Sequence, residues 1–289
     1  MKTAVIAIGG NAIEGLLSSD NPGIQAAARD IAGIARLGYR VVVTHGNGPQ
    51  VGTLLENNEK LSVAEAVSLT QAEIGYVLSG AIERELGRGH GVVVFTRVLV
   101  NAKDKAFQQP TKPIGPAYKE KLSSSCVFQP GKGWRRVVAS PEPGKIIESK
   151  TILSLMKSGL VVIACGGGGM PVVEKNGDFQ PVEAVIDKDL AAWRLAELVD
   201  ADVLLILTDV EYAFLDHGTQ SQAPLRVLTT RAAESFLKEG VFAPGSMKEK
   251  ILASARFVNK DKRRTAIIGK LGLGVSALHG ETGTHIVSN

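Results

Sequence analysis

Three glycine-rich turns are the residues of this sequence whose types and spacing could do chemistry. They are Gly9-Gly10-Asn11, Gly46-Asn47-Gly48 and the turn that begins with Gly166-Gly167, and each follows a run of apolar residues. Glycine leaves backbone N–H groups uncovered where a helix dipole is positive, which suits an anion such as a carboxylate or a phosphoryl group. A single turn of this kind could contain glycine only because its backbone conformation requires it. Several together favour an anion site.

Two lysines fall in the first turns of expected helices. Asp187, Lys188 and Asp189 open one helix, and Ser246–Glu249 has capping-box spacing, which puts Lys250 in the first turn of another. A positive charge there is unfavourable to the helix dipole, so the position of each lysine suggests a function. The alternative is a solvated lysine on the surface. Lysines, backbone N–H groups and Mg²⁺ are what stabilises a phosphoryl group in transfer. The pattern therefore favours a phosphoryl-transfer site.

Other familiar sites are disfavoured by their motifs. The sequence has no GxxxxGK[ST], and neither Gly9-Gly10 nor the glycines from Gly166 fit GxGxxG. A GxSxG nucleophile elbow is also missing, so a hydrolase of that type has no support. His45 follows an expected strand, and this chemistry needs no imidazole nucleophile, so we expect His45 to be structural.

The composition bounds the class of protein. The 289 residues are 44% hydrophobic and 5% aromatic, with a net charge of +4. Lysine and arginine are scattered and aromatic residues are few, so nucleic acid is a poor candidate partner. No apolar run approaches the ~20 residues that span a bilayer, and the start makes a poor signal peptide. Cys126 and Cys165 are isolated from each other, which favours reduced thiols in a cytoplasmic protein.

The elements that must position these residues alternate between strands and helices. Residues 3–8 and 39–44 are expected strands joined by a helix, and both end in a Gly/Asn turn. A right-handed crossover brings both turns to the carboxyl edge of one sheet. The further expected elements are helices at 64–86, 145–157, 231–238 and from 246, strands at 92–95, 160–164, 203–207, 265–268 and 284–288, a hairpin at Asn176-Gly177, and a polar loop from 208 to 225. Residues 101–136 are rich in proline and lysine without periodicity, and we expect a small excursion that acts as a lid.

The sequence resembles carbamate kinases, of the amino-acid kinase superfamily, in order along nearly the whole chain. The blocks THGNGPQVG from Thr44 and VIDKD from Val185 are the specific ones. The other similar blocks are IGGNA from Ile8, QPTKPIGP from Gln109, WRRVVASP from Trp134, ACGGGG from Ala164, ILTDV from Ile206 and FAPGSM from Phe242.

The resemblance implies an α/β fold, a three-layer αβα sandwich with an open, mainly parallel sheet. Residues 1–199, with the lid at about 101–136, would form the carbamate- and phosphoryl-binding lobe, and residues 200–289 the nucleotide-binding lobe. It also implies a cytoplasmic homodimer of arginine metabolism that transfers phosphate reversibly between ATP and carbamate, giving carbamoyl phosphate and ADP. Mg²⁺ would be required, with no metal ligand assigned among the protein side chains, and no membrane would be bound.

The resemblance also assigns roles to residues. The catalytic residues would be Lys188, Asp189, Lys250 and, from the lid, Lys112, for which an exposed lid lysine is the alternative. The residues that bind substrate and phosphoryl group would be Gly9, Gly10, Asn11, Gly46, Asn47, Gly48, Gly166 and Gly167. The nucleotide site would consist of Thr208, Asp209, Val210, Phe214, Pro244, Gly245, Ser246 and Met247.

Three departures from the family pattern bear on details. The segment between Asn11 and Ile24 is short, Glu73 replaces a small or apolar residue, and residues 210–214 read VEYAF. They concern the substrate pocket, the dimer contacts and the packing of adenine. Two other functions stay open: another acyl-phosphate kinase acting on an amino-acid carboxylate, and a catalytically idle paralogue that binds nucleotide.

Overall fold

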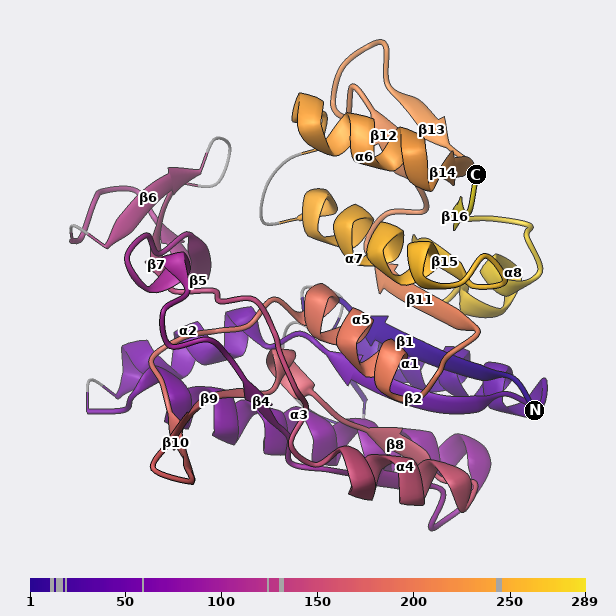
Figure 1. Ribbon diagram of the computed structural model, residues 1–289, viewed down its shortest axis with the longest axis horizontal. Coiled ribbons are helices and arrows are strands. Elements are labelled where there is room, and N and C mark those ends of the chain that lie inside the picture. The colour runs from indigo at the N-terminus through magenta and orange to yellow at the C-terminus, as the bar shows by residue number, and fades with distance from the viewer. Residues whose placement is uncertain are drawn as a thin grey trace.

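A single large sheet runs through the middle of the protein (Figure 1). The computed structural model describes residues 1–10, 13, 18, 20–58, 60–123, 125–129, 133–242 and 246–289. Across the sheet its eight strands are β14 (Val227–Thr229), β16 (Thr284–Val287), β15 (Thr265–Lys270), β11 (Val203–Thr208), β1 (Thr3–Ile8), β2 (Arg40–His45), β8 (Val161–Ile163) and β3 (Gly91–Val93). Neighbours pair in parallel except β15 and β16, which are antiparallel. The expected open, mainly parallel sheet is confirmed.

Helices cover both faces of this sheet. One core unites the sheet with α4 (Ser149–Lys157), α5 (Lys188–Leu198), α6 (Thr230–Glu239) and α7 (Met247–Lys260). The other core unites it with α1 (Pro22–Arg36), α3 (Val63–Leu86) and α8 (Gly274–Leu278). Every residue of β1 is buried because both of its faces are covered. The three-layer αβα sandwich is confirmed.

The expected excursion is a small antiparallel sheet that projects from the large one (Figure 1). It consists of β5 (Lys112–Tyr118), β7 (Gly133–Val138) and β6 (Cys126–Gln129), in that spatial order. The prolines hid this regularity in the sequence, but β5 is an edge strand, where proline is tolerated. A third, smaller core packs this sheet against α3 and α2 (Gly48–Asn57) through Val51, Val67 and Ile114.

Several expected boundaries and motifs need correction. The helix expected from residue 145 begins at Ser149, and the expected polar loop to Leu225 contains a hairpin of β12 (Ala213–Leu215) and β13 (Ala223–Leu225). Ser246 does sit at the N-cap of α7, but its side chain makes no capping hydrogen bond. Its backbone dihedrals, φ −147° and ψ −102°, lie outside the extended region usual for a capping residue.

The remaining elements complete the connections. The hairpin at Asn176-Gly177 is confirmed, with β9 (Met170–Lys175) and β10 (Asp178–Pro181) antiparallel, and β9 pairs in turn with β4 (Arg97–Leu99). The boundary at residue 199 falls between α5 and β11, and the large sheet continues across it. The division into a substrate lobe and a nucleotide lobe stays a prediction. In the part of the chain that the structure describes, no helix has the length and apolarity that crossing a membrane requires.

Asp30 ties α1 to the loop that leads into α8. Its carboxylate accepts hydrogen bonds from the backbone N–H groups of Gly272 at 2.7 Å and Gly274 at 2.9 Å. Replacing Asp30 by Ala should lower the free energy of unfolding by about 1–3 kcal/mol, because the buried N–H group of Gly274 loses its partner, whereas the exposed Gly272 can turn to water. Thermal or urea unfolding measures this. Asp178→Ala, at an exposed carboxylate in β10, is the control and should change little. Equal stability of the two variants would contradict this role.

Candidate active site

The three glycine turns meet at the carboxyl edge of neighbouring strands. Gly9 N–H donates to the Leu207 carbonyl at 2.9 Å, and Gly46 N–H donates to the Ile8 carbonyl at 2.9 Å. The turns after β1 and β2 therefore continue the strand register side by side, as the sequence predicted. They border a cavity of about 220 Å³. Of the residues expected to bind substrate, those that line it are Gly9, Gly10, Gly46, Asn47, Gly48 and Gly167.

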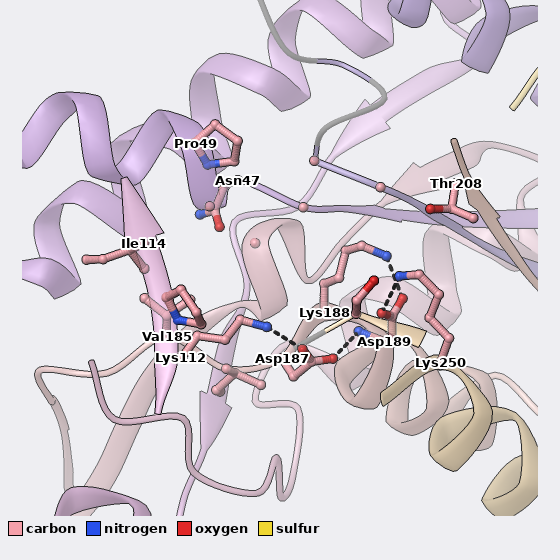
Figure 2. A pocket seen from close by; sticks show the side chains of 18 of the residues that line it. Asn47, Pro49, Lys112, Ile114, Val185, Asp187, Lys188, Asp189, Thr208 and Lys250 are labelled. Atoms are coloured by element: carbon pink, nitrogen blue, oxygen red, sulfur yellow. Dashed lines mark hydrogen bonds and ion pairs between the residues drawn. The ribbon is translucent and has the colours of Figure 1, made fainter. Parts of the chain in front are cut away.

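Two lysines share one buried carboxylate at the side of this cavity (Figure 2). Asp189 is 3% exposed and pairs through Oδ1 with Lys188 Nζ and through Oδ2, at 2.8 Å, with Lys250 Nζ. Lys188 and Asp189 come from the first turn of α5, and Lys250 from the first turn of α7. The fold thus brings together the two lysines that the sequence singled out, 62 positions apart by their numbers, 250 minus 188.

Burial and mutual charge set the protonation of this cluster. Burial is the largest influence on the pKa of Asp189 and would raise it, but Lys188 and Lys250 together hold that pKa well below its ordinary value. Burial, with the nearby charge of Lys250, lowers the pKa of Lys188 to about 8. Burial also opposes the charge of Lys250, but Asp189 outweighs it and raises the pKa of Lys250. At neutral pH the cluster carries two positive charges and one negative charge, so it attracts an anion.

Asp187 connects the start of α5 to β5 of the small antiparallel sheet. Its Oδ1 caps the helix by accepting the N–H groups of Asp189 at 2.9 Å and Leu190 at 3.3 Å. Its Oδ2 pairs with Lys112 Nζ of β5 (Figure 2). Lys112 therefore lines the cavity and is not the exposed lid lysine that was the alternative. The sequence placed Asp187 in the first helical turn but assigned it no role in the site.

The third turn needs glycine for space and for backbone conformation. Gly167 has φ +65°, and a Cβ built on it would lie 2.0 Å from Asn47 Nδ2. Gly166 packs against His45 behind the cavity and does not line it. His45 is fully buried, and burial lowers its pKa to about 4, so the ring is neutral at pH 7. This agrees with the structural role expected for His45.

The residues expected at the nucleotide divide into three groups. Thr208, Asp209 and Ser246 line the cavity. Val210, Phe214 and Met247 are not among the described residues that line it; Phe214 packs edge-to-face on Tyr212, with ring centroids 6.3 Å apart. Asn11, Pro244 and Gly245 lie outside the described residues.

Sequence reasoning missed several cavity residues. They are Pro49, Pro113, Ile114, Arg135, Val185, Ile186 and Asp187. Arg135 donates through Nη2 to the Gly115 carbonyl at 2.5 Å, which joins β7 to β5. The block WRRVVASP contains Arg135, but two adjacent arginines gave no sign of which one faces the site. Within the described ranges no three His, Cys, Asp or Glu side chains form a group that could hold a metal ion.

Comparison with known proteins identifies the family. The sequence profile of the amino acid kinase family matches residues 2–269. The chain belongs to this family.

Within it, several relatives point to one branch. The carbamate kinase of Pyrococcus horikoshii is 44% identical over 98% of this chain and 98% of its own length. The solved structure of the Giardia lamblia carbamate kinase bound to citric acid superposes with a TM-score of 0.88 at 34% identity, covering 100% of this chain and 99% of that one. A second structure of the Giardia enzyme, bound to AMP-PNP, gives a TM-score of 0.86 over the same shares. The chain therefore groups with the carbamate kinases.

Proposed function

We infer that this protein is a carbamate kinase, which transfers a phosphoryl group reversibly between ATP and carbamate to give ADP and carbamoyl phosphate. The observation that carries this conclusion is the pair of lysines that share buried Asp189 beside the glycine turns. The similarity to carbamate kinases over nearly the full length supports carbamate as the acceptor of the phosphoryl group.

In the proposed reaction the protein positions the reactants and stabilises charge. Charge on the phosphoryl group in transfer is spread over its equatorial oxygens. Lys188 and Lys250 neutralise that charge, and Asp189 holds both ammonium groups in place. The glycine turns after β1 and β2 offer backbone N–H groups to the same oxygens. Thr208, Asp209 and Ser246 border the nucleotide, and Lys112 closes the cavity from the lid.

We propose that Mg²⁺ enters with the nucleotide. Mg²⁺ usually keeps several waters and binds through substrate phosphates with one or two carboxylates. The carboxylates of Asp187 and Asp189 already bind lysines and the N–H groups at the start of α5. This favours a metal that is held chiefly by the phosphates. The AMP-PNP complex of the Giardia enzyme supports ATP and ADP as the nucleotides. Both cysteines are free thiols, which supports the cytoplasm as the location.

The first experiment follows ATP formation from ADP, Mg²⁺ and carbamoyl phosphate, with acetyl phosphate as the second donor. We expect rapid ATP formation from carbamoyl phosphate and much slower formation from acetyl phosphate. No turnover with either donor, in folded protein that still binds ADP, would contradict the proposed function. It would favour another acyl acceptor or an idle paralogue.

The pH dependence of turnover should report Lys188. Its ammonium group is charged below its pKa of about 8 and loses that charge as the pH rises through this value. The kcat/KM for carbamoyl phosphate should therefore fall above about pH 8, since this parameter reflects the free enzyme. In Lys188→Arg the side chain stays charged, so the fall should move to higher pH if activity remains. An unchanged profile in that variant would show that another group titrates.

We also propose a homodimer that uses the outer face of α3. Leu69 and Tyr76 on this helix are 52% and 78% exposed, and Glu73 lies between them. Large apolar side chains on one exposed face are typical of an interface. Tyr76→Glu should lower the mass in light scattering to that of a monomer. Leu122→Glu, at an exposed leucine of the lid region, is the control and should leave the mass unchanged.

A further inference from the structure

Asn47 is held in one orientation by a residue outside the cavity. Asn47 is 2% exposed, and its Nδ2 donates to Thr70 Oγ1 of α3 at 2.9 Å. Thr70 is fully buried and does not line the cavity. Gly167 packs closely against the amide of Asn47, because a Cβ at Gly167 would lie 2.0 Å from Nδ2 and 2.6 Å from Oδ1. The amide therefore has little room to swing.

The hydrogen bonds of Thr70 decide which end of that amide faces it. The Thr70 hydroxyl lies 2.8 Å from the Ala66 carbonyl and 3.1 Å from the Val67 carbonyl, both of which can only accept. Its single proton is thus used within α3, and its oxygen must accept from Asn47. Only the NH₂ end of the amide can donate, so Nδ2 faces Thr70 and Oδ1 faces away from it.

Asn47 Oδ1 is an acceptor without a partner in the part of the chain described. No described residue donates to it, and Asn47 lines the same cavity as Lys112 and Lys188 (Figure 2). The cationic side chains that line the cavity, which are donors only, are Lys112, Arg135, Lys188 and Lys250. The carboxylates of Asp187 and Asp189 are already engaged by Lys112, Lys188 and Lys250. An uncharged acceptor in such a site suits an uncharged N–H donor of the substrate.

We propose that Asn47 Oδ1 accepts a hydrogen bond from the amino group of carbamate and carbamoyl phosphate, and that Thr70 is the positioning residue that directs this oxygen to the cavity. The inference rests on the proposed carbamate kinase activity and names the group that gives this site its specificity. Acetyl phosphate has the same shape as carbamoyl phosphate but carries a methyl group in place of the amino group. A site built to bond an N–H group rejects such an analogue, since its own polar atom is left unpaired.

The test measures the ratio of kcat/KM for carbamoyl phosphate to kcat/KM for acetyl phosphate. Thr70→Val keeps the shape of the side chain but removes the oxygen that accepts from Asn47. The amide then loses the hydrogen bond that fixes which of its ends faces the cavity, and we expect the ratio to fall by about tenfold, the worth of one hydrogen bond. Thr70→Ser keeps the hydroxyl and should keep the ratio of the parent protein.

A second variant covers a failure of Thr70→Val to fold, which thermal unfolding and ADP binding detect. Asn47→Ala removes the acceptor itself and should lower the same ratio. An equal loss with both donors in Thr70→Val and Asn47→Ala would assign these residues a general structural role and overturn the inference. That result would leave the proposed function intact, provided the parent protein forms ATP rapidly from carbamoyl phosphate. A parent protein inactive with carbamoyl phosphate would overturn both.

Discussion

Replacing Lys250 by Ala is expected to lower the rate of ATP formation from carbamoyl phosphate and ADP at least a hundredfold. Lys250 is buried, and its charge faces the cavity from the first turn of α7 while Asp189 holds it at 2.8 Å. In the proposed reaction this charge stabilises the phosphoryl group chiefly in the transition state. Removing one preorganised group of that kind costs about 10²–10³ in kcat. Lys188→Ala should have a loss of similar size, because the two lysines act on the same group.

The measurement must separate lost chemistry from lost stability. Breaking a buried ion pair by removing one partner is destabilising by about 3–5 kcal/mol, although Asp189 keeps its second lysine here. Thermal unfolding and ADP binding of each variant therefore accompany the kinetics. Lys248→Ala is the matched control: the same change of charge, two residues away at an exposed position of α7. If Lys188→Ala and Lys250→Ala both turned over at nearly the rate of this control, the roles proposed for the lysines would be wrong.

The parts of the fold that the sequence predicted well are those encoded locally. Branched apolar runs such as Thr3–Ile8 identify buried strands, and the glycines that follow them identify their carboxyl ends. Because parallel strands end at one edge, two turns far apart in sequence could be placed together from the sequence alone. Lys188 could be recognised for a similar reason: a lysine in the first turn of a helix has a local cost that needs an explanation.

What the sequence did not predict depends on contacts between distant residues. The pair of Lys112 and Asp187 joins residues 75 positions apart, and no local pattern links them. The hydrogen bond from Asn47 to Thr70 could not be predicted either, because in the sequence Asn47 is one residue of a turn and Thr70 is an ordinary residue of a helix. Capping-box spacing at Ser246 was misleading because the backbone there does not adopt the required conformation, whereas Ser62 and Glu65 do form such a box at α3.

Replacing Gly52 by Ala is expected to lower turnover by at least about tenfold through the lid, without touching the reactants. Gly52 lies in α2, and a Cβ built on it would be 1.7 Å from the Cα of Gly115 in β5. Real Cβ atoms never come so close to backbone, so β5 would have to move away from α2. Gly115 has φ +68°, so its own backbone is specialised for this contact. Lys112 belongs to the same strand and would move with it, away from Asp187.

This variant should also unfold at a lower temperature, since overpacking of a tight contact costs about 1–3 kcal/mol. The matched control is Gly80→Ala, at a helical glycine of α3 whose added Cβ would meet no atom within 4 Å. There alanine should be neutral or slightly stabilising, because it restricts the unfolded chain. Turnover by Gly52→Ala equal to that of Gly80→Ala would mean that the position of β5 does not matter for the reaction. A loss confined to Gly52→Ala, in protein that remains folded and binds ADP, would make the contact of α2 with β5 the support that holds Lys112 at the cavity.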